Sequence, residues 1–358
     1  MEKKFRVGVI GCGQIAQMMH IPYIAENTGF EIVGLCDISA GVLSELADRY
    51  RLPADRLYTN YNEMLEKAGL DLVVITTRDH YAPSIAASRA RVCQVIEKPL
   101  ALNLRQASEM VEAARENGVW IALGYMKCYD PNAQHFASLV RAMPAPTYVC
   151  AHDFGGSMAY TDVVYDLTVA NDLPESLAAE GMASMNALLM EDAQSDELLP
   201  IYFLMLLSLS HDLALLKMIF GKPNGIRHAS TCNGVLTVVF DYGRFSCILE
   251  GTNYKKRTFW DEKLTVYSED CELSLKFPWP YLKNAPSTIY INENEADTLT
   301  NVEKTVVASY DEAYRCEWRE FYACLTEGRR PAVDGESGLE DIRIFNDVLQ
   351  ALRTNREK

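Results

Sequence analysis

The stretch Val7-Gly8-Val9-Ile10-Gly11-Cys12-Gly13-Gln14-Ile15-Ala16 decides the fold of the first part of the chain. Its first four residues form an apolar run that predicts a buried strand. Gly11 permits a tight turn, Gly13 lets backbone amides approach a pyrophosphate, and Ala16 lets the following helix pack closely on the strand. An anion bound at this turn sits on the N-terminus of that helix. We therefore expect a dinucleotide-binding turn whose ligand-facing residues are Gly11, Gly13, Gln14 and Ile15.

The end of the next predicted strand carries Asp37, and this acidic residue supports the same interpretation. A glycine-rich turn that binds nothing is the alternative, but the strand before it, the helix after it and the acidic residue disfavour that alternative. The carboxylate of Asp37 suits a ribose diol and repels a 2′-phosphate, and Ile38 and Ser39 supply no cation to neutralise one. The pattern therefore predicts NAD rather than NADP.

Length, charge and cysteine usage limit the classes of protein to which the chain can belong. Its 358 residues exceed one hydrophobic core, so two domains are expected, and a net charge of −15 disfavours nucleic acid as a partner. No stretch approaches the ~20 apolar residues of a membrane span, and the first strand begins too early for a signal peptide. We therefore expect a cytoplasmic protein without a membrane partner. The ten cysteines form no C-x-x-C pair, so neither a disulfide framework nor a metal site is expected.

Short apolar runs alternate with helical stretches over residues 1–125, which predicts an α/β Rossmann domain with a parallel, doubly wound sheet. Its strands are expected at residues 6–10, 32–36, 72–76, 92–96 and 119–123. Its helices are expected at residues 40–50, 61–67, 81–90 and 104–117. Asn103 is suited to begin the last of these helices and Gly118 to end it.

Residues 126–358 differ, because strands follow one another there with few helices between them. This pattern predicts an α+β domain on a mostly antiparallel open sheet. The strands are expected at residues 147–153, 228–233, 235–241, 245–251, 264–268, 272–277 and 287–292, and the helices at 132–142, 312–328 and 338–354. The C-terminal helices can pack back on the Rossmann domain. An insertion at about residues 155–209 is helix-like and apolar, and either forms packing or subunit contacts or shapes a substrate site.

Glu97-Lys98-Pro99 follows the strand expected at residues 92–96. Ligands bind at the carboxyl ends of the strands in an open parallel sheet, so we expect Glu97 and Lys98 beside the nicotinamide end of a dinucleotide. The alternative for Lys98 is a surface ammonium that closes a strand. The end of the strand at residues 72–76 and the loop after it add Thr76, Thr77 and His80 as candidate cofactor contacts, although solvent exposure alone explains His80 equally well.

Motifs along nearly the whole chain carry a family resemblance: Gly11–Ala16, Glu97-Lys98-Pro99, Gly124-Tyr125 with Asp130-Pro131-Asn132, His211-Asp212-Leu213, and the tail from Phe321 to Gly338. The chain resembles the glucose–fructose oxidoreductase, inositol dehydrogenase and rhizopine-catabolism family. The resemblance implies an NAD-dependent oxidoreductase in which Lys98 and His211 are catalytic. It also implies a cis Lys98-Pro99 peptide bond, and a homo-oligomer whose subunits meet through the sheet of the second domain.

Oxidation of a secondary alcohol needs a base for the hydroxyl proton while a hydride leaves the carbon. A cationic Lys98 at the carbinol oxygen stabilises the developing alkoxide, and a neutral His211 accepts the proton, directly or through Lys98. His211 follows the very apolar run Tyr202–Leu209, so a core histidine that caps a buried helix is the alternative.

The chain departs from the family's pattern on the substrate side. Leu207 and Ala214 stand where many relatives have aspartates around the histidine, so Asp212 is expected to orient His211 instead. Cys128-Tyr129 replaces the usual Arg-Phe pair. A neutral sugar offers only hydroxyls, which favours recognition by tyrosines, amides and carboxylates. The candidate substrate-binding residues are Tyr125, Tyr129, Asn132 and Asp212.

The sequence therefore predicts an oxidoreductase that acts on a ring secondary hydroxyl of a sugar, glycoside or cyclitol. Its most specific form is oxidation at C3 of a glucosyl unit. A redox-assisted glycosidase or lyase that recycles NAD is one alternative, and accumulation of NADH separates the two. A catalytically silent NAD-binding sensor is the other alternative, and it is disfavoured because a sensor needs neither Lys98 nor His211.

Overall fold

The computed structural model describes residues 4–295 and 299–356, and its contacts divide them into two compact units. The first unit contains the residues up to Gly124, together with Thr161–Gln194 and Glu317–Ile342. The second contains Tyr125–Tyr160, Ser195–Cys316 and the residues from Arg343 onward. The predicted domains 1–125 and 126–358 stay a prediction, since the first unit also takes in two later segments.

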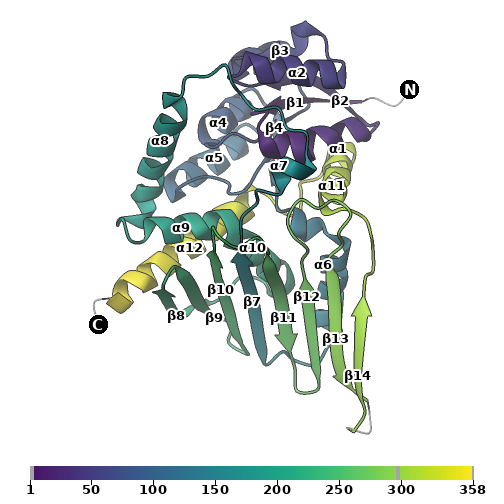
Figure 1. The fold of residues 1–358 in the computed structure, drawn as a ribbon, viewed down its shortest axis with the longest axis vertical. Helices are drawn as coiled ribbons and strands as arrows, with labels where there is room; N and C mark the ends of the chain where they lie inside the picture. Colours follow the sequence, from purple (N-terminus) through teal and green to yellow (C-terminus); the bar gives the residue numbers. More distant parts are fainter. Residues whose placement is uncertain (1–3, 296–298, 357–358) are drawn as a thin grey trace. The chain divides into compact units, whose positions relative to one another are not determined.

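The first unit is built on a six-stranded parallel sheet with the order β3-β2-β1-β4-β5-β6. Figure 1 labels its strands β1 to β4. Its strands are β1 (Phe5–Ile10), β2 (Phe30–Cys36), β3 (Leu57–Tyr58), β4 (Leu72–Ile75), β5 (Cys93–Ile96) and β6 (Ile121–Leu123). The strand order reverses between β1 and β4, and ligands bind at such a point in doubly wound sheets. The predicted Rossmann fold is confirmed, although the two-residue β3 was not expected.

Helices connect the strands of this sheet at the positions that their end residues indicate. They are η1 (Ala16–His20, π-helical), α1 (Ile21–Glu26), α2 (Ala40–Tyr50), η2 (Ala54–Arg56), α3 (Tyr61–Lys67), α4 (Tyr81–Arg89) and α5 (Leu104–Glu116). The Ser39 hydroxyl caps α2 by accepting from Val42 N at 3.1 Å. Asn103 caps α5 as predicted, and Gly118 follows that helix with a φ of +70° that suits glycine.

The second unit contains an eight-stranded sheet with the order β14-β13-β12-β11-β7-β10-β9-β8. Its strands are β7 (Tyr148–Gly155), β8 (Gly225–Cys232), β9 (Val235–Asp241), β10 (Ser246–Asn253), β11 (Asp261–Tyr267), β12 (Cys271–Lys276), β13 (Thr288–Asn294) and β14 (Asn301–Val306). Strands β7 and β10 pair in parallel, and the other pairs in the described sheet are antiparallel. The mostly antiparallel sheet is thus confirmed, although β14 was not expected.

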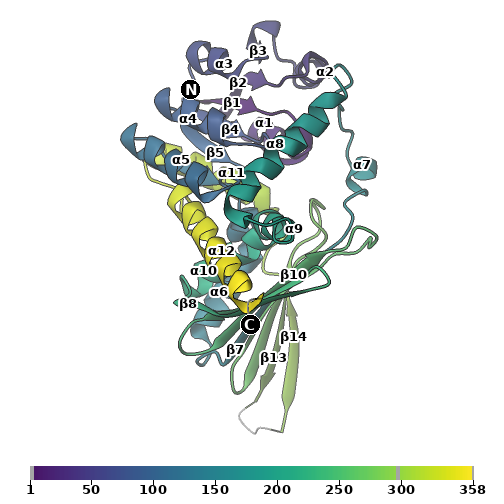
Figure 2. The ribbon, with the colours of Figure 1, turned by 90° about the vertical axis from the view of Figure 1, so that its left-hand side faces the viewer.

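One face of this second sheet is covered by helices. Helices α6 (Pro131–Ala142) and α10 (Ser210–Phe220) pack on it, next to the short 3₁₀ helix η3 (Met126–Tyr129) (Figure 2). The central strand β7 alternates accordingly, with Val149 and Ala151 fully buried and their neighbours partly exposed. The other face of the sheet is therefore accessible in this chain.

The insertion is helical, as predicted, and it is shared between the two units. It forms α7 (Thr161–Val164), α8 (Ser176–Ala193), α9 (Leu199–Leu204) and η4 (Met205–Leu209, π-helical). Helix α8 buries only Leu189 and Ala193, whereas Leu177 and Met182 are exposed. Most of its apolar residues are therefore not fully buried within the described chain, and the subunit contact expected for them stays a prediction.

Two helices near the C-terminus, α11 (Ala313–Glu327) and α12 (Gly335–Arg356), are each divided between the units. The part of α11 that belongs to the first unit packs on β2. The rings of Trp318 and Tyr322 lie 5.4 and 5.5 Å from the ring of Phe30, both in edge-on geometry. The core of the Rossmann unit is thus completed by residues almost 300 positions away in the sequence.

The prediction that no stretch approaches the apolar length of a membrane span was wrong. Leu199–Phe220 forms 22 consecutive helical residues with a mean hydropathy of 1.7 in its most apolar window, long and apolar enough to cross a membrane by length and composition. However, 72% of that window is buried inside the protein, as in the core helix of a soluble protein. This helix is apolar over its length because the second unit covers most of its surface.

Candidate active site

The glycine turn after β1 has the geometry that the sequence predicts. Gly11 adopts a φ of +88°, and a Cβ added to it would lie 2.9 Å from Thr77 N, so only glycine fits. Thr76 closes the same turn, because its hydroxyl donates to Gly11 O at 2.5 Å. A Cβ added to Gly13 would meet no atom within 4 Å, whereas Ala16 is fully buried. The backbone at Gly13 is therefore open to a ligand while the helix behind it is packed.

Asp37 lies at the carboxyl end of β2 and contacts this turn directly. One of its carboxylate oxygens accepts a hydrogen bond from Cys12 N at 2.7 Å, and the other accepts from Ser39 N at 2.9 Å. Neighbouring Ile38 is 63% exposed. The structure thus brings the acidic residue beside the glycine turn, as expected for a residue that meets a ribose. Ile15 is half-buried at the start of the helix, and the Gln14 side chain donates to Thr161 at 2.7 Å.

Glu97 directly follows β5 and takes part in a buried chain of hydrogen bonds. Its carboxylate lies 2.8 Å from His20 Nε2, and Trp318 Nε1 donates to His20 Nδ1 at 3.3 Å. Because an indole N–H only donates, His20 Nδ1 accepts and Nε2 donates to Glu97. Burial acts to raise the pKa of Glu97, but His20 and Lys98 outweigh it and the pKa is lowered. His20 and Trp318 were not predicted from the sequence, because their partners are far away along the chain.

Lys98 follows at the same edge of the sheet and is half-buried. The predicted cis peptide bond between Lys98 and Pro99 is present. Lys98 N donates to the Glu97 carboxylate at 3.2 Å, and His80 Nδ1 lies 2.9 Å from Pro99 O. Burial lowers the pKa of His80, which favours the neutral ring. The nearly buried His80 therefore holds the backbone beside Lys98, and a contact between its ring and the cofactor stays a prediction.

His211 lies in the second unit, near the start of α10, and is half-buried. Its ring packs edge-on against the ring of Tyr125, with 5.7 Å between the centroids. Tyr125 is almost completely buried. The structure thus brings together two of the residues predicted for the substrate side.

Asp212 does not turn toward solvent but joins a buried charged cluster. Asp153, Asp212 and Glu262 place carboxylate oxygens within 4.8 Å of one another, and the Lys127 ammonium forms an ion pair with Glu262. Burial, followed by the charges of Glu262 and Asp153, raises the pKa of Asp212 well above its ordinary value. No metal site was expected from the sequence. These three carboxylates could together hold a cation, and the Lys127 ammonium is a cation that the chain itself places among them.

The two remaining substrate candidates have structural partners. Asn132 is buried, accepts hydrogen bonds from Ala308 N at 2.7 Å and Ser309 N at 3.1 Å, and donates to Ser309 O at 2.9 Å. Its amide therefore fixes the 308–309 backbone. Tyr129 is also buried. Substrate contacts of Asn132 and Tyr129 stay predictions.

Comparison with known proteins agrees with the geometry of the first unit. Residues 5–125 match the model of the Gfo/Idh/MocA oxidoreductase family, described by its NAD-binding Rossmann fold. This segment belongs to that family. The resemblance predicted from the glycine turn and the Glu97-Lys98-Pro99 motif is therefore confirmed.

Two named relatives are each similar to about a third of this chain. Inositol 2-dehydrogenase from Salmonella typhimurium is 30% identical over 129 residues, which are 35% of this chain and 38% of that protein. D-glucoside 3-dehydrogenase from Escherichia coli is 30% identical over 122 residues, 34% of each chain. The chain thus matches little more than a third of the length of these relatives. The structure of aldose–aldose oxidoreductase from Caulobacter crescentus is similar over 99% of both chains with a TM-score of 0.73 at 16% identity, a likeness of fold alone.

Proposed function

We propose that the protein is an NAD-dependent dehydrogenase that oxidises a ring secondary hydroxyl of a sugar, glycoside or cyclitol. One observation carries this proposal: an open glycine turn and Lys98, whose backbone N donates to the Glu97 carboxylate, lie at the carboxyl edge of one parallel sheet. In doubly wound sheets, ligands bind at this edge. The relatives named as inositol and D-glucoside dehydrogenases support the substrate class.

The residues at the edge fit a nicotinamide dinucleotide. The open space at Gly13 would take the pyrophosphate, Asp37 would accept hydrogen bonds from the ribose diol, and exposed Ile38 would support the adenine. NAD is favoured because Ile38 and Ser39 bring no cation for a 2′-phosphate. When bound, the nicotinamide accepts a hydride from the carbinol carbon.

Lys98 and His211 divide the proton chemistry in this proposal. The Lys98 ammonium donates to the carbinol oxygen and stabilises negative charge that develops there. His211, as a neutral imidazole, accepts the hydroxyl proton. Glu97 is a positioning residue, because its carboxylate accepts from Lys98 N while His20 holds the carboxylate in place.

The proposal also includes association of identical subunits. The accessible face of the second sheet carries part-exposed Tyr148, His152 and Phe154 on β7, and Tyr290 on β13 is 44% exposed. A face rich in aromatic side chains is suited to contact between subunits. Light scattering of the purified protein tests this, and a monomer at micromolar concentration would contradict it.

The reaction is tested with the purified protein, NAD or NADP, and a panel of neutral sugars. The panel contains myo-inositol, glucose, methyl glucosides and a nitrophenyl glucoside. Formation of NADH supports the proposed dehydrogenase, and Lys98→Met should abolish it while NAD still binds. Release of nitrophenol without net NADH would replace the proposal by the redox-assisted glycosidase. A protein that binds NAD and turns over none of the panel would refute the substrate class, and one that does not bind NAD would refute the whole proposal.

A further inference from the structure

Residues 161–175 of the first unit, which we call the strap, run along the cofactor-binding edge. Its first residue, Thr161, accepts a hydrogen bond from the Gln14 side chain at 2.7 Å. Further along, Thr168 N donates to the Gln17 side chain at 2.9 Å, and that side chain donates back to Thr168 O at 3.0 Å. Since Gln14 belongs to the glycine turn, the strap begins beside the dinucleotide turn itself.

The strap continues along α2 and reaches the N-terminus of that helix. Asp166 pairs with the Arg49 guanidinium on α2 at 3.1 Å. The carboxylate of Asp172 then accepts a hydrogen bond from Ser39 Oγ at 2.5 Å and another from Gly41 N at 2.9 Å. These two hydrogen bonds lower the pKa of Asp172, so its side chain is an anion at neutral pH.

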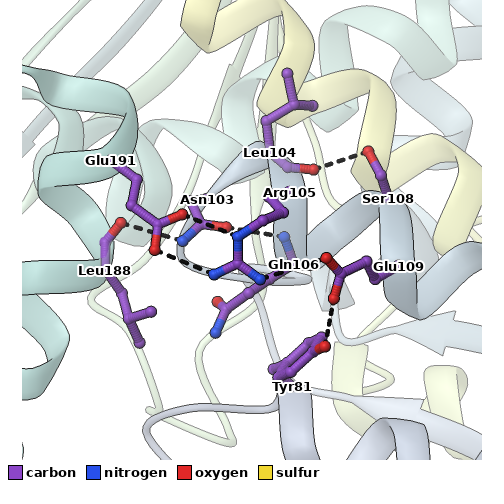
Figure 3. Close-up of polar contacts among 9 residues, drawn as sticks. All are labelled: Tyr81, Asn103, Leu104, Arg105, Gln106, Ser108, Glu109, Leu188 and Glu191. Atoms are coloured by element: carbon purple, nitrogen blue, oxygen red, sulfur yellow. Dashed lines mark hydrogen bonds and ion pairs between the residues drawn. The ribbon is translucent and has the colours of Figure 1, made fainter.

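Helix α8, which follows the strap, is attached to the start of α5 (Figure 3). The Arg105 guanidinium binds both carboxylate oxygens of Glu191 at 3.1 Å. Asn103 Nδ2 donates to Leu188 O at 3.2 Å. The strap is therefore attached to the first unit at Thr161 and Thr168, before Asp172, and the helix that follows it is attached near its own C-terminal end.

The position of Asp172 matters because of what lies next to it. Ser39 and Gly41 follow Asp37, the residue expected to meet the ribose 2′-hydroxyl, so a 2′-phosphate would extend toward them. The first amides of the eleven-residue helix α2 favour an anion. A Cβ added to Gly41 would meet the Asp172 carboxylate at 3.6 Å, whereas one added to Gly13 would meet no atom within 4 Å. The strap thus fills the anion position at α2 and leaves the pyrophosphate position open.

We propose that Asp172 is a specificity-determining residue that excludes the 2′-phosphate of NADP from the N-terminus of α2. The inference rests on the proposed function, because it assumes that this edge binds a nicotinamide dinucleotide. The Asp172 carboxylate takes the Ser39 and Gly41 donors that a 2′-phosphate would need, and it adds a like charge beside that of Asp37. A ribose with a free 2′-hydroxyl requires neither donor, so NAD binds without displacing the strap.

Binding of two fragments of the cofactors, one without and one with a 2′-phosphate, tests this inference without any catalytic reaction. Calorimetric titration gives the Kd of 5′-AMP and of adenosine 2′,5′-bisphosphate for the native protein and for Asp172→Ala. The ratio of the bisphosphate Kd to the AMP Kd should fall at least fivefold in Asp172→Ala, because the variant frees two donors and removes one negative charge. A strap that merely stabilised the fold would change both Kd values alike and leave the ratio unaltered.

Asp166→Ala is the matched control. It removes a carboxylate from the same strap, but one that pairs with Arg49 away from the donors at α2. In Asp166→Ala, the ratio of the bisphosphate Kd to the AMP Kd should stay within twofold of the native value. An unchanged ratio in Asp172→Ala, or an equal fall in Asp166→Ala, overturns the inference even where NAD binds tightly. If neither AMP nor NAD binds any form of the protein, the proposed function fails and this inference fails with it.

Discussion

Replacement of His20 by leucine should destabilise the first unit in a way that depends on pH. In the native protein, the buried Glu97 carboxylate lies 2.8 Å from His20 Nε2, and this contact helps to hold the pKa of Glu97 below its ordinary value against the effect of burial. Leucine is similar in volume to histidine but donates no hydrogen bond. In the His20→Leu variant, Glu97 therefore stays buried and loses this donor.

The size and the sign of the effect follow from this geometry. A hydrogen bond to a charged group contributes about 1.5–3 kcal/mol, and a buried charged group that loses its donor costs more than a neutral one, so we expect a loss of about 3 kcal/mol in the free energy of unfolding at pH 7.5. The native contribution of Glu97 is present above the unfolded pKa of a carboxyl group and is lost as pH falls through its lowered native pKa. In the variant, burial raises that pKa, so the penalty is largest at neutral pH and fades as acid protonates the carboxyl group.

Thermal unfolding followed by circular dichroism at pH 7.5 and pH 5 measures both quantities. A loss of about 3 kcal/mol corresponds to a Tm lower by about 6–12 °C for a unit of this size, and the deficit at pH 5 should be less than half as large. Glu97→Gln in the His20→Leu background is the matched control, because it removes the buried charge and should restore most of the Tm. Equal deficits at the two pH values, or no recovery in the double variant, would refute the reasoning.

Three further predictions concern the proposed catalytic residues, the preference for NAD over NADP, and the buried charges of the second unit. Lys98→Ala and His211→Ala should each lower kcat about a hundredfold or more while the Kd for NAD stays within a few-fold, and turnover close to that of the parent would remove the corresponding role. The native protein should bind NAD at least tenfold more tightly than NADP, and Asp37→Ala should narrow that difference in direct titrations. Lys127→Met should destabilise the protein by about 3 kcal/mol in urea unfolding at pH 7.5, and less at pH 5, because it leaves the Asp212 and Glu262 carboxyls buried without their cation. An equal loss at both pH values would contradict that explanation.

Features set by neighbouring residues were predicted well from the sequence. Asn103 begins α5 because its side chain caps Gln106 N three residues later. The Gly11 turn is likewise set by residues close together in the sequence. Strands β3 and β14 were missed because β3 has two residues and β14 is mostly exposed, so neither leaves a strong alternating pattern.

Features that depend on distant partners could not be predicted in this way. His20 was not singled out because its importance comes from Glu97 and from Trp318, which is 298 residues away. Asp172 is one exposed carboxylate among many until the fold brings it to Ser39, 133 residues earlier in the chain. The cluster around Lys127 likewise comes from η3, β7, α10 and β11, four elements whose association no local pattern indicates.

The packing of α11 on β2 bears on how this protein can be rebuilt from parts of its relatives. Phe30 packs against Trp318 and Tyr322, and Gly29 has no room for a side chain because the Tyr322 ring lies against it. A chimera that takes only residues 1–125 from a relative would set a foreign surface at positions 29 and 30 against the original α11. If residues 317–327 are transplanted together with that segment, both sides of this contact come from the same parent protein. For modular engineering, the unit of exchange is therefore discontinuous in the gene although it is contiguous in space.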